Sequence, residues 1–336
     1  MIDSSEDRFT LRYYDSIRSS RVGWLWYPYI PYGKITILQG DPGEGKTTMM
    51  LQLAAMMSSG RSIPDGKEKV EPEVVIFQGN EDGHEDTIKP RLEEAGADCS
   101  KVAFIQSKQD LSLGESIFGD AIKQSGARLL IIDPLQAFIG NDRELLRPGG
   151  IREAFRELTW TAEETDCAIV MISHMNKNSG GKSIYRGLGS IDVAAVARSV
   201  LMLERDREEP DVRVLLPIKS SLAPEGKAYA FRLDPIDGFS WIGESDYTIG
   251  DFPGSVVGSR KLAQAKFALE AFLYQDKSAN DVMKQMEKLS IGKRTVDTAK
   301  KELGIYSYRK GGSWYWHLPD GNESRKRTDT HDVGIC

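Results

Sequence analysis

The sequence predicts an α/β fold in which helices cover a mostly parallel twisted sheet, with an antiparallel extension and a small helical domain after it. Three observations lead to this prediction. Short apolar runs alternate with helical patterns over the first two thirds of the 336-residue chain, as expected for a parallel sheet. A glycine-rich loop joins the first of these runs to a helix. Residues 259–318 are basic, whereas the rest of the chain is acidic.

The expected elements follow from apolar periodicity. A buried strand over 34–40 precedes the glycine-rich loop, and apolar residues at helical spacing predict a helix over 47–59. Five further apolar runs are expected to complete the parallel part of the sheet, at 73–79, 101–106, 128–134, 167–173 and 199–205. Three later runs, at 212–219, 228–234 and 239–243, are spaced like antiparallel neighbours.

The glycine-rich loop fits the P-loop pattern, Gly40-x-x-x-x-Gly45-Lys46-Thr47. Small residues allow successive backbone N–H groups to surround an anion, and the N-terminus of the following helix adds its dipole. Lys46 is expected to reach the β- and γ-phosphates of a nucleotide, and the Thr47 hydroxyl is expected to hold Mg²⁺. The residues predicted to contact the nucleotide are Gly40, Asp41, Pro42, Gly43, Glu44, Gly45, Lys46, Thr47 and Thr48.

Acidic residues follow two of the other predicted strands. Asp133 ends the run "LLIID", where P-loop proteins place a carboxylate for Mg²⁺; a simple turn or helix cap is the alternative. Because Pro134 follows instead of a glutamate, the base that activates water must come from elsewhere. Glu81 and Asp82 stand at the carboxyl end of the 73–79 strand, where a carboxylate could accept a proton from water. The alternative is a pair of solvated loop acids.

Composition restricts the class of protein. The chain is 40% hydrophobic and 28% charged, as expected for a soluble protein with room for about two domains. No apolar run approaches the roughly 20 residues of a membrane helix, and "MIDSSEDRFT" is too polar for a signal peptide. A cytoplasmic location is therefore expected, with no membrane partner. Cys99, Cys167 and Cys336 are far apart and indicate reduced thiols.

The charge distribution separates a basic C-terminal module from an acidic body. Residues 259–318 contain 12 Lys and Arg against 6 Asp and Glu, a net charge of +6, whereas the whole chain carries −6. The expected organisation is a lead-in segment over 1–23, a body over 24–250, a Gly/Pro/Ser linker over 251–258, the basic module over 259–318 and a disordered tail over 319–336.

The basic module has the pattern of a winged helix-turn-helix. Helices are expected over 260–275, 278–289 with Ser278 as N-cap, and 290–303 ending at Gly304; a hairpin about a Lys-Gly-Gly turn follows. The third helix is expected to enter the major groove of duplex DNA. Its expected groove contacts are Lys293, Arg294, Thr295 and Thr298, and the expected phosphate contacts are Lys300, Arg309 and Lys310. Winged helices also bind proteins, so a protein-docking role is the alternative.

Several motifs together make the resemblance specific. The segments "WLWYPYIPYGKITILQGDPGEGKTT", "FQGNEDG", "LLIIDPLQAF", "ISHMNK" and "RGLGSIDVAAVARSVLML", in this order, resemble those of the RecA-fold ATPases related to the plasmid replicative helicase RepA, a family of plasmids, phages and integrative elements. The similarity covers roughly 24–244. It implies a RecA-like core that binds ATP and Mg²⁺, and an oligomer that in the helicases is a hexameric ring.

The resemblance also implies roles for single residues. Glu81 matches the catalytic glutamate, Asp133 the second acidic residue, and His174 the position that senses the γ-phosphate. Arg198 matches an arginine finger that acts on a neighbouring subunit, with Arg186 as a rival for that role. Lys219 is a further candidate for a contact in trans. Here the sequence departs from the DnaB-type helicases, in which an Arg stands two residues after that Lys; this chain has Ser221.

Two segments occupy the places where RecA-like proteins contact single-stranded DNA. They are 134–150 and 175–190, and the second offers Lys177, Lys182, Tyr185 and Arg186 to phosphates and bases. An exposed loop without this role is the alternative. Trp24, Trp26 and Tyr27 could flank the adenine, although core packing is the commoner use of such aromatics.

Two functions remain open from the sequence. One is an ATP-driven DNA motor of the RepA-like helicase type, which could also contact other replication proteins. The other is an ATP-switched DNA-binding regulator or helicase loader that does not unwind DNA. Both need Lys46, but only the motor needs rapid turnover stimulated by single strands.

Overall fold

The computed structural model of the chain describes residues 11–319 apart from 65, 67–70, 114, 140–149, 175–195, 253–255 and 290. Its centre is a nine-stranded sheet. In spatial order the strands are β11 (Gly238–Ser245), β10 (Ala228–Asp234), β9 (Val212–Ser220), β8 (Ser199–Arg205), β3 (Ile35–Gly40), β7 (Ala168–His174), β6 (Leu129–Asp133), β4 (Val75–Gly79) and β5 (Val102–Ala103). Neighbouring strands are parallel in the order β8, β3, β7, β6, β4 and β5. They are antiparallel in the order β8, β9, β10 and β11. The predicted mostly parallel sheet and its extension are confirmed.

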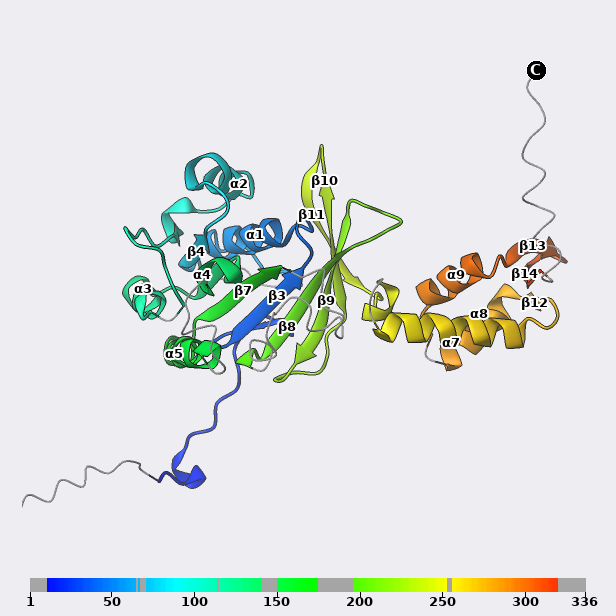
Figure 1. Ribbon diagram of the computed structural model, residues 1–336, viewed down its shortest axis with the longest axis horizontal. Coiled ribbons are helices and arrows are strands. Elements are labelled where there is room, and N and C mark those ends of the chain that lie inside the picture. Colours follow the sequence, from blue (N-terminus) through cyan, green and yellow to red (C-terminus); the bar gives the residue numbers. More distant parts are fainter. Residues whose placement is uncertain are drawn as a thin grey trace, which may run out of the picture.

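The two faces of the sheet are covered by different helices (Figure 1). Strand residues alternate between the faces, so that Leu38 packs with α1 (Lys46–Ser58) and α2 (Lys89–Glu94), whereas Ile37 packs on the other side. That side is covered by α3 (Ile117–Ser125), α4 (Leu135–Ile139) and α5 (Gly150–Thr165). Parallel strands with both faces covered explain the near-continuous apolar runs of the sequence.

Strand register brings four polar segments to one edge of the sheet. Gly40 pairs with His174 at the ends of β3 and β7, and Gly79 pairs with Asp133 at the ends of β4 and β6. The P-loop and the segments that follow β4, β6 and β7 therefore all begin at the carboxyl edge, which is where open α/β sheets bind ligands.

The strand predicted over 101–106 is much shorter in the structure, where β5 spans only Val102–Ala103. The reason lies in the neighbouring strand β4. The backbone N–H of Ile105 donates to the Gln78 side-chain Oε1 at 2.8 Å instead of to a strand carbonyl. This side-chain bond replaces the backbone ladder, and the chain turns away from the sheet after Ala103.

Smaller elements surround the sheet. Residues 11–23 run away from the body with a short 3₁₀ turn η1 (Tyr14–Ser16), and a hairpin of β1 (Trp24–Trp26) and β2 (Ile30–Pro31) precedes β3 (Figure 1). A π-helical turn η2 (His84–Ile88) leads into α2, and the turn η3 (Cys99–Lys101) leads into β5. No helix in the described part of the chain is long and apolar enough to cross a lipid bilayer.

The C-terminal module contains α7 (Val256–Phe272), α8 (Ala279–Lys288) and α9 (Lys293–Glu302), with a three-stranded sheet of β12 (Lys277–Ser278), β14 (Ser313–His317) and β13 (Tyr306–Lys310). Its own apolar core includes Leu269, Met286, Val296 and Trp316. The Ser278 hydroxyl accepts from Asp281 N–H, which confirms the predicted N-cap. The three predicted helices and the hairpin are therefore present.

The linker predicted over 251–258 differs from the structure. The turn η5 (Ile249–Asp251) continues the body, and α7 already begins at Val256, four residues earlier than the predicted start at 260. No proline follows Pro253 in this stretch, so a helix can start directly after it despite Gly258 and Ser259. Residues 1–10 and 320–336, including almost all of the tail predicted to be disordered, lie outside the described residues.

Candidate nucleotide-binding and DNA-binding sites

The P-loop connects β3 to α1 in a conformation that requires glycine at two positions. A Cβ on Gly40 would lie 2.5 Å from the carbonyl oxygen of Leu203 in β8. Gly45 has φ +88°, in the left-handed region, and immediately precedes α1. The close approach of β8 and the tight turn into the helix explain why both glycines of the motif are needed. The result is a loop of backbone N–H groups at the N-terminus of a 13-residue helix, a suitable site for phosphates.

Lys46 lies inside this loop. Its side chain is only 4% exposed, and Nζ donates to the carbonyl oxygens of Gly40 at 2.9 Å and Asp41 at 2.7 Å. Burial lowers the pKa of Lys46, while the nearby carboxylate of Asp133 acts in the opposite direction. A phosphate at this place would offer Nζ charged oxygens in exchange for two neutral carbonyls.

Thr47 and Asp133 meet beside the loop. The Thr47 hydroxyl donates to Asp133 Oδ2 at 2.5 Å, and the Asp133 residue is 6% exposed. Burial raises the pKa of this carboxyl, and the bond from Thr47 lowers it. A hydroxyl and a buried carboxylate next to a phosphate loop form the oxygen donor set that suits Mg²⁺, which takes few protein ligands and completes its shell with phosphates and water. The residues present therefore fit the expected ion.

Glu81 and Asp82 have different surroundings. Asp82 forms an ion pair with Arg91 of α2 at 3.1 Å. Glu81 Oε2 lies 3.6 Å from His174 Nε2. Both acids border a small hollow of about 20 Å³ that is also lined by Thr47 and Asp133. Because Asp82 is already paired with an arginine, Glu81 is the better placed of the two to accept a proton from water.

His174 ends β7 between the P-loop strand and β6. Its Nε2 faces Glu81, and its buried Nδ1 has no hydrogen-bond partner among the described residues. Gln136 of α4 donates to the backbone oxygen of His174 at 3.3 Å and to the hydroxyl of Ser173 at 2.9 Å. The end of β7 is thus held on one side by α4 and approaches the candidate base on the other.

Two arginines that the sequence analysis did not identify hold the P-loop from the side. Arg205 lies 3.3 Å from Glu44 Oε2 and donates to the Gly43 oxygen at 3.2 Å. Arg213, which is 6% exposed, donates to the Glu44 oxygen at 3.1 Å. They are paired residues at the ends of β8 and β9. The contacts are long-range in sequence, so only the hydrophobic pattern that predicts β8 and β9 as neighbours could have suggested them.

Arg198 and Lys219 lie at the opposite edge of the sheet from the P-loop. Leu203 is adjacent to Gly40, and Arg198 precedes it by five residues, which corresponds to about 16 Å along an extended strand. Lys219 donates to the Ala197 oxygen at 2.8 Å, so the two cations are neighbours. An arginine side chain is shorter than this distance. Neither residue can therefore reach the phosphate site of its own chain.

The aromatic residues before β3 do not flank the nucleotide. Trp26 is 2% exposed and packs against Tyr29, Tyr229 and Trp241. The hydroxyl of Ser199, at the amino end of β8, donates to the Tyr29 oxygen at 2.6 Å. This contact places the segment at the amino edge of the sheet, away from the P-loop, and Trp26 is a core residue, as the core-packing alternative expects.

The first turn of α9 contacts the body through two residues that were expected to contact DNA. Arg294 forms an ion pair with Asp206, and its guanidinium lies 3.6 Å from the centroid of the Tyr247 ring. Thr295 is 4% exposed and donates to Asp251 Oδ1 at 2.9 Å. Both side chains point toward the body because α9 packs against α7 and η5. In this arrangement neither is available to a DNA groove.

The other predicted DNA contacts differ in exposure. Lys293, Thr298, Arg309 and Lys310 are exposed. Lys300 is partly buried, donates to the Ser307 hydroxyl at 2.6 Å and lies over the Trp316 ring. The remaining candidates, Lys177, Lys182, Tyr185 and Arg186, lie outside the described residues, as does most of the first candidate DNA loop.

Comparison with known proteins supports the family. A family model described as an AAA domain matches residues 6–180, more than half of the 336-residue chain. The DNA repair protein RadA of Halalkalibacterium halodurans is 24% identical over 237 residues, which cover 69% of this chain and 46% of RadA. The chain therefore spans about half the length of this relative.

Three solved structures are also similar. The RadB recombinase is 18% identical with a TM-score of 0.46, and the match covers 61% of this chain and 89% of that chain. The ATPase domain of G40P is 16% identical with a TM-score of 0.46, and the match covers 60% of this chain and 81% of that chain. A DnaB-like replicative helicase is 16% identical with a TM-score of 0.48, and the match covers 62% of this chain and 56% of that chain. Because these TM-scores are low, the assignment rests on the strand order, the P-loop and the match of the family model. The chain belongs to the AAA domain family and is a RecA-fold P-loop ATPase.

Proposed function

We propose that this chain hydrolyses ATP with Mg²⁺ and acts on DNA as an oligomeric motor of the RepA-like helicase type. The observation that supports it best is the convergence of Thr47, Glu81 and Asp133 on one hollow beside the P-loop. Thr47 lies in the first turn of α1, Glu81 follows β4 and Asp133 ends β6, so only the fold brings them together.

The proposed chemistry assigns one task to each side chain. The P-loop N–H groups and Lys46 hold the phosphates, and Thr47 with Asp133 would hold the metal ion, which neutralises charge on the phosphate oxygens. Glu81 orients the attacking water and accepts its proton. His174, 3.6 Å from Glu81, is placed to report whether the terminal phosphate is present.

The positions of Arg198 and Lys219 support an oligomer. Both lie at the amino edge of the sheet and cannot reach the nucleotide of their own chain, as the strand geometry requires. A second copy that packs this edge against the P-loop edge would bring them to its neighbour's phosphates. Such a heterologous contact closes into a ring when the rotation between copies permits. A hexamer is the ring size that the resemblance implies.

The C-terminal module supports duplex DNA as a partner. Three helices followed by a hairpin have the order of a winged helix, and residues 259–318 carry a net charge of +6. Exposed Lys293, Arg309 and Lys310 are available to phosphates. The similar protein RadA is named for DNA repair, which agrees with a DNA partner for the body.

A second candidate function is favoured by one observation, the contact of Arg294 and Thr295 with the body. A helix that is held in this way is suited to an ATP-switched DNA-binding regulator or helicase loader. In that case nucleotide binding would control whether α9 is released, and strand separation would not be needed.

The test is to measure ATP hydrolysis with and without single-stranded DNA, together with oligomer mass in a non-hydrolysable ATP analogue. The motor predicts strong stimulation and a ring; the switch predicts slow turnover that single strands do not change. Glu81→Gln should retain ATP binding and slow hydrolysis by about 10²- to 10⁴-fold, because an amide cannot accept the proton. Asp82→Asn is the matched control, and an equal loss in both variants would contradict the role of Glu81.

A further inference from the structure

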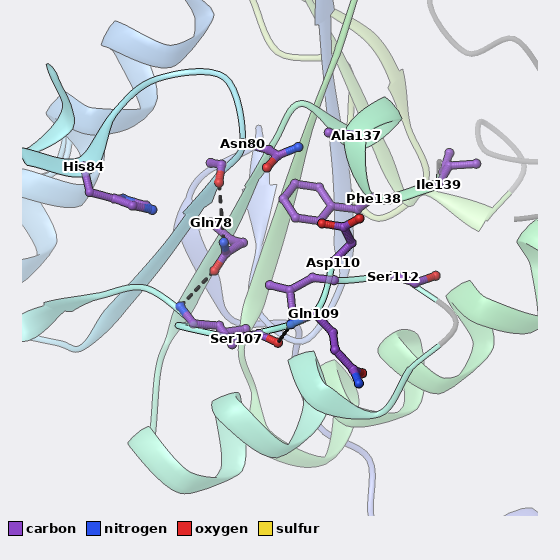
Figure 2. Close-up of a pocket in the computed structure, with 13 residues that line it drawn as sticks. Gln78, Asn80, His84, Ser107, Gln109, Asp110, Ser112, Ala137, Phe138 and Ile139 are labelled. Atoms are coloured by element: carbon purple, nitrogen blue, oxygen red, sulfur yellow. Dashed lines mark hydrogen bonds between the residues drawn. The ribbon is translucent and has the colours of Figure 1, made fainter. Parts of the chain in front are cut away.

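A second, larger cavity lies at the carboxyl edge of the sheet, next to the candidate catalytic hollow. Its volume is about 490 Å³, and it is formed by the end of β4, the segment 105–112 and α4. Figure 2 shows Gln78, Asn80, Phe138 and Asp110 around a common space, whereas Ile139 points away from it. Cavities of this size commonly accept small organic ligands or parts of larger ones.

The walls of the cavity are held in place by the fold. Gln78 is 5% exposed, and its Oε1 is fixed by the N–H of Ile105 at 2.8 Å. Phe138 is 4% exposed and packs edge-on against Phe118. The Phe138 oxygen accepts from Leu113 N–H at 3.0 Å, which ties the 105–112 segment to α4. The cavity is thus formed by anchored residues on three sides.

The chemistry of the lining indicates what kind of group it would bind. The lining contains side-chain amides, hydroxyls, an imidazole and one carboxylate, but neither lysine nor arginine. A phosphate or another anion would find no opposite charge here. Amides and a carboxylate beside an aromatic ring are instead the groups by which proteins recognise the edges and faces of nucleobases. A carboxylate accepts from an exocyclic amino group and repels a carbonyl oxygen.

The position of the cavity connects it with the catalytic residues. Asn80 lines the cavity, and its neighbour Glu81 lines the catalytic hollow. The backbone N–H of Asn80 donates to the oxygen of Asp133 at 3.1 Å. A ligand that binds the side-chain amide of Asn80 therefore contacts the residue directly before Glu81, the candidate general base.

We propose that this cavity receives one unpaired nucleobase of a single-stranded nucleic acid, and that Asp110 favours bases with an exocyclic amino group. The inference rests on the proposed DNA function. It adds that the cavity contacts a base of the strand and that Asp110 distinguishes between bases. The sugar and phosphate remain outside, where exposed Lys108 stands between the lining residues Ser107 and Gln109. Occupation of the cavity positions Asn80 and, through it, Glu81.

The experiment compares two strands whose bases differ in the group at C4 and in the proton on N3. The affinities of the full chain for (dC)20 and (dU)20, about 20 nucleotides long to cover one site of a single-strand binder, are measured by fluorescence anisotropy at fixed salt. Cytosine carries an amino group where uracil carries a carbonyl oxygen, so (dC)20 should bind at least about fivefold more tightly. Asp110→Asn should remove or reverse this preference, because its amide can donate to the uracil oxygen. ATP hydrolysis should be stimulated in the same order.

Glu115→Gln is the matched control, since it removes an exposed carboxylate close in sequence but outside the cavity. It should change both affinities alike and keep their ratio. Equal affinity of the unaltered chain for both strands, or the same ratio change in both variants, overturns the proposal. If neither strand binds, the proposed DNA function fails. Titration of the chain with free cytidine and uridine then tests base recognition by the cavity separately, and equal affinity for the two nucleosides overturns it.

Discussion

The contact between Asp206 and Arg294 predicts that the body restrains α9. Asp206 has a side chain only 4% exposed, and its Oδ1 accepts from the N–H groups of Glu208 at 2.8 Å and Glu209 at 3.3 Å. Arg294 is 37% exposed at its side chain. Breaking a fully buried pair costs about 3–5 kcal/mol, but solvent at Arg294 reduces this value. We expect the substitution Asp206→Asn to weaken the docking of α9 by about 1–3 kcal/mol.

The substitution preserves the turn because an asparagine oxygen can still accept from the same two backbone N–H groups. Its effect should therefore be on docking rather than on the fold of the body. While α9 is mostly docked, the apparent affinity for duplex DNA is reduced by the fraction of molecules in which α9 is free. Asp206→Asn should accordingly raise duplex affinity by about 5- to 100-fold. Anisotropy of a labelled duplex, titrated with the full chain at fixed salt, measures this change.

Glu208→Gln provides the control, since Glu208 is an exposed carboxylate in the same turn. It removes one negative charge without touching Arg294, so it reports the general effect of charge on DNA binding. If the two variants raise duplex affinity equally, the docked α9 does not limit binding and the duplex contacts another face of the module. Tyr247→Ala, which removes the ring beneath Arg294, should act in the same direction as Asp206→Asn.

Three further predictions concern other parts of the chain. Lys46→Ala should abolish ATP binding in a fluorescent-nucleotide assay, because the phosphates lose their fixed positive charge; unchanged affinity would contradict the P-loop assignment. A chain ending at Phe252 should keep ATP hydrolysis but lose most duplex affinity and much of its salt dependence, as measured by anisotropy of a labelled duplex at several salt concentrations; unchanged duplex affinity would assign the duplex contacts to the body. Hydrogen bonds from Tyr308 and then His317 lower the pKa of Asp276 in the folded chain. The ionised carboxylate therefore stabilises the hairpin above the ordinary aspartate pKa of 3.8, and this stability is lost as the pH falls through the lower folded pKa. Asp276→Asn should remove this acid dependence of the melting temperature, and an unchanged dependence would assign it to other groups.

The parts of the site that could be predicted from sequence are those that depend on local patterns. Asp133 and Glu81 each follow an apolar strand, and parallel strands bring their carboxyl ends to one edge of a sheet. Their position therefore follows from hydrophobic runs and strand direction. The P-loop is similar, because its motif residues stand in one short segment, although the close approach that requires Gly40 comes from Leu203 of β8. For the P-loop residues, proximity in sequence and proximity in space nearly coincide.

The contacts that could not be predicted are between segments far apart in the chain. Arg205 and Arg213 meet Glu44 across more than 160 residues, and no local pattern distinguishes them from surface arginines. Arg294 is a similar case. The helical periodicity of α9 places it on a polar face, but periodicity does not tell which element covers that face. The shortening of β5 also has a distant cause, because it depends on the side chain of Gln78 in another strand.

The carboxyl end of β8 joins these distant contacts. Arg205 reaches Glu44 and Gly43 of the P-loop, and the next residue, Asp206, holds Arg294 of α9. Adjacent residues in an extended chain point in opposite directions, so one strand end can contact the nucleotide loop on one side and the C-terminal module on the other. Lys46 must exchange its bonds to Gly40 and Asp41 for phosphate oxygens when ATP binds. We expect the loop to move at Gly43 and Glu44 in that exchange, and Arg205 then transmits the movement to the backbone that positions Asp206.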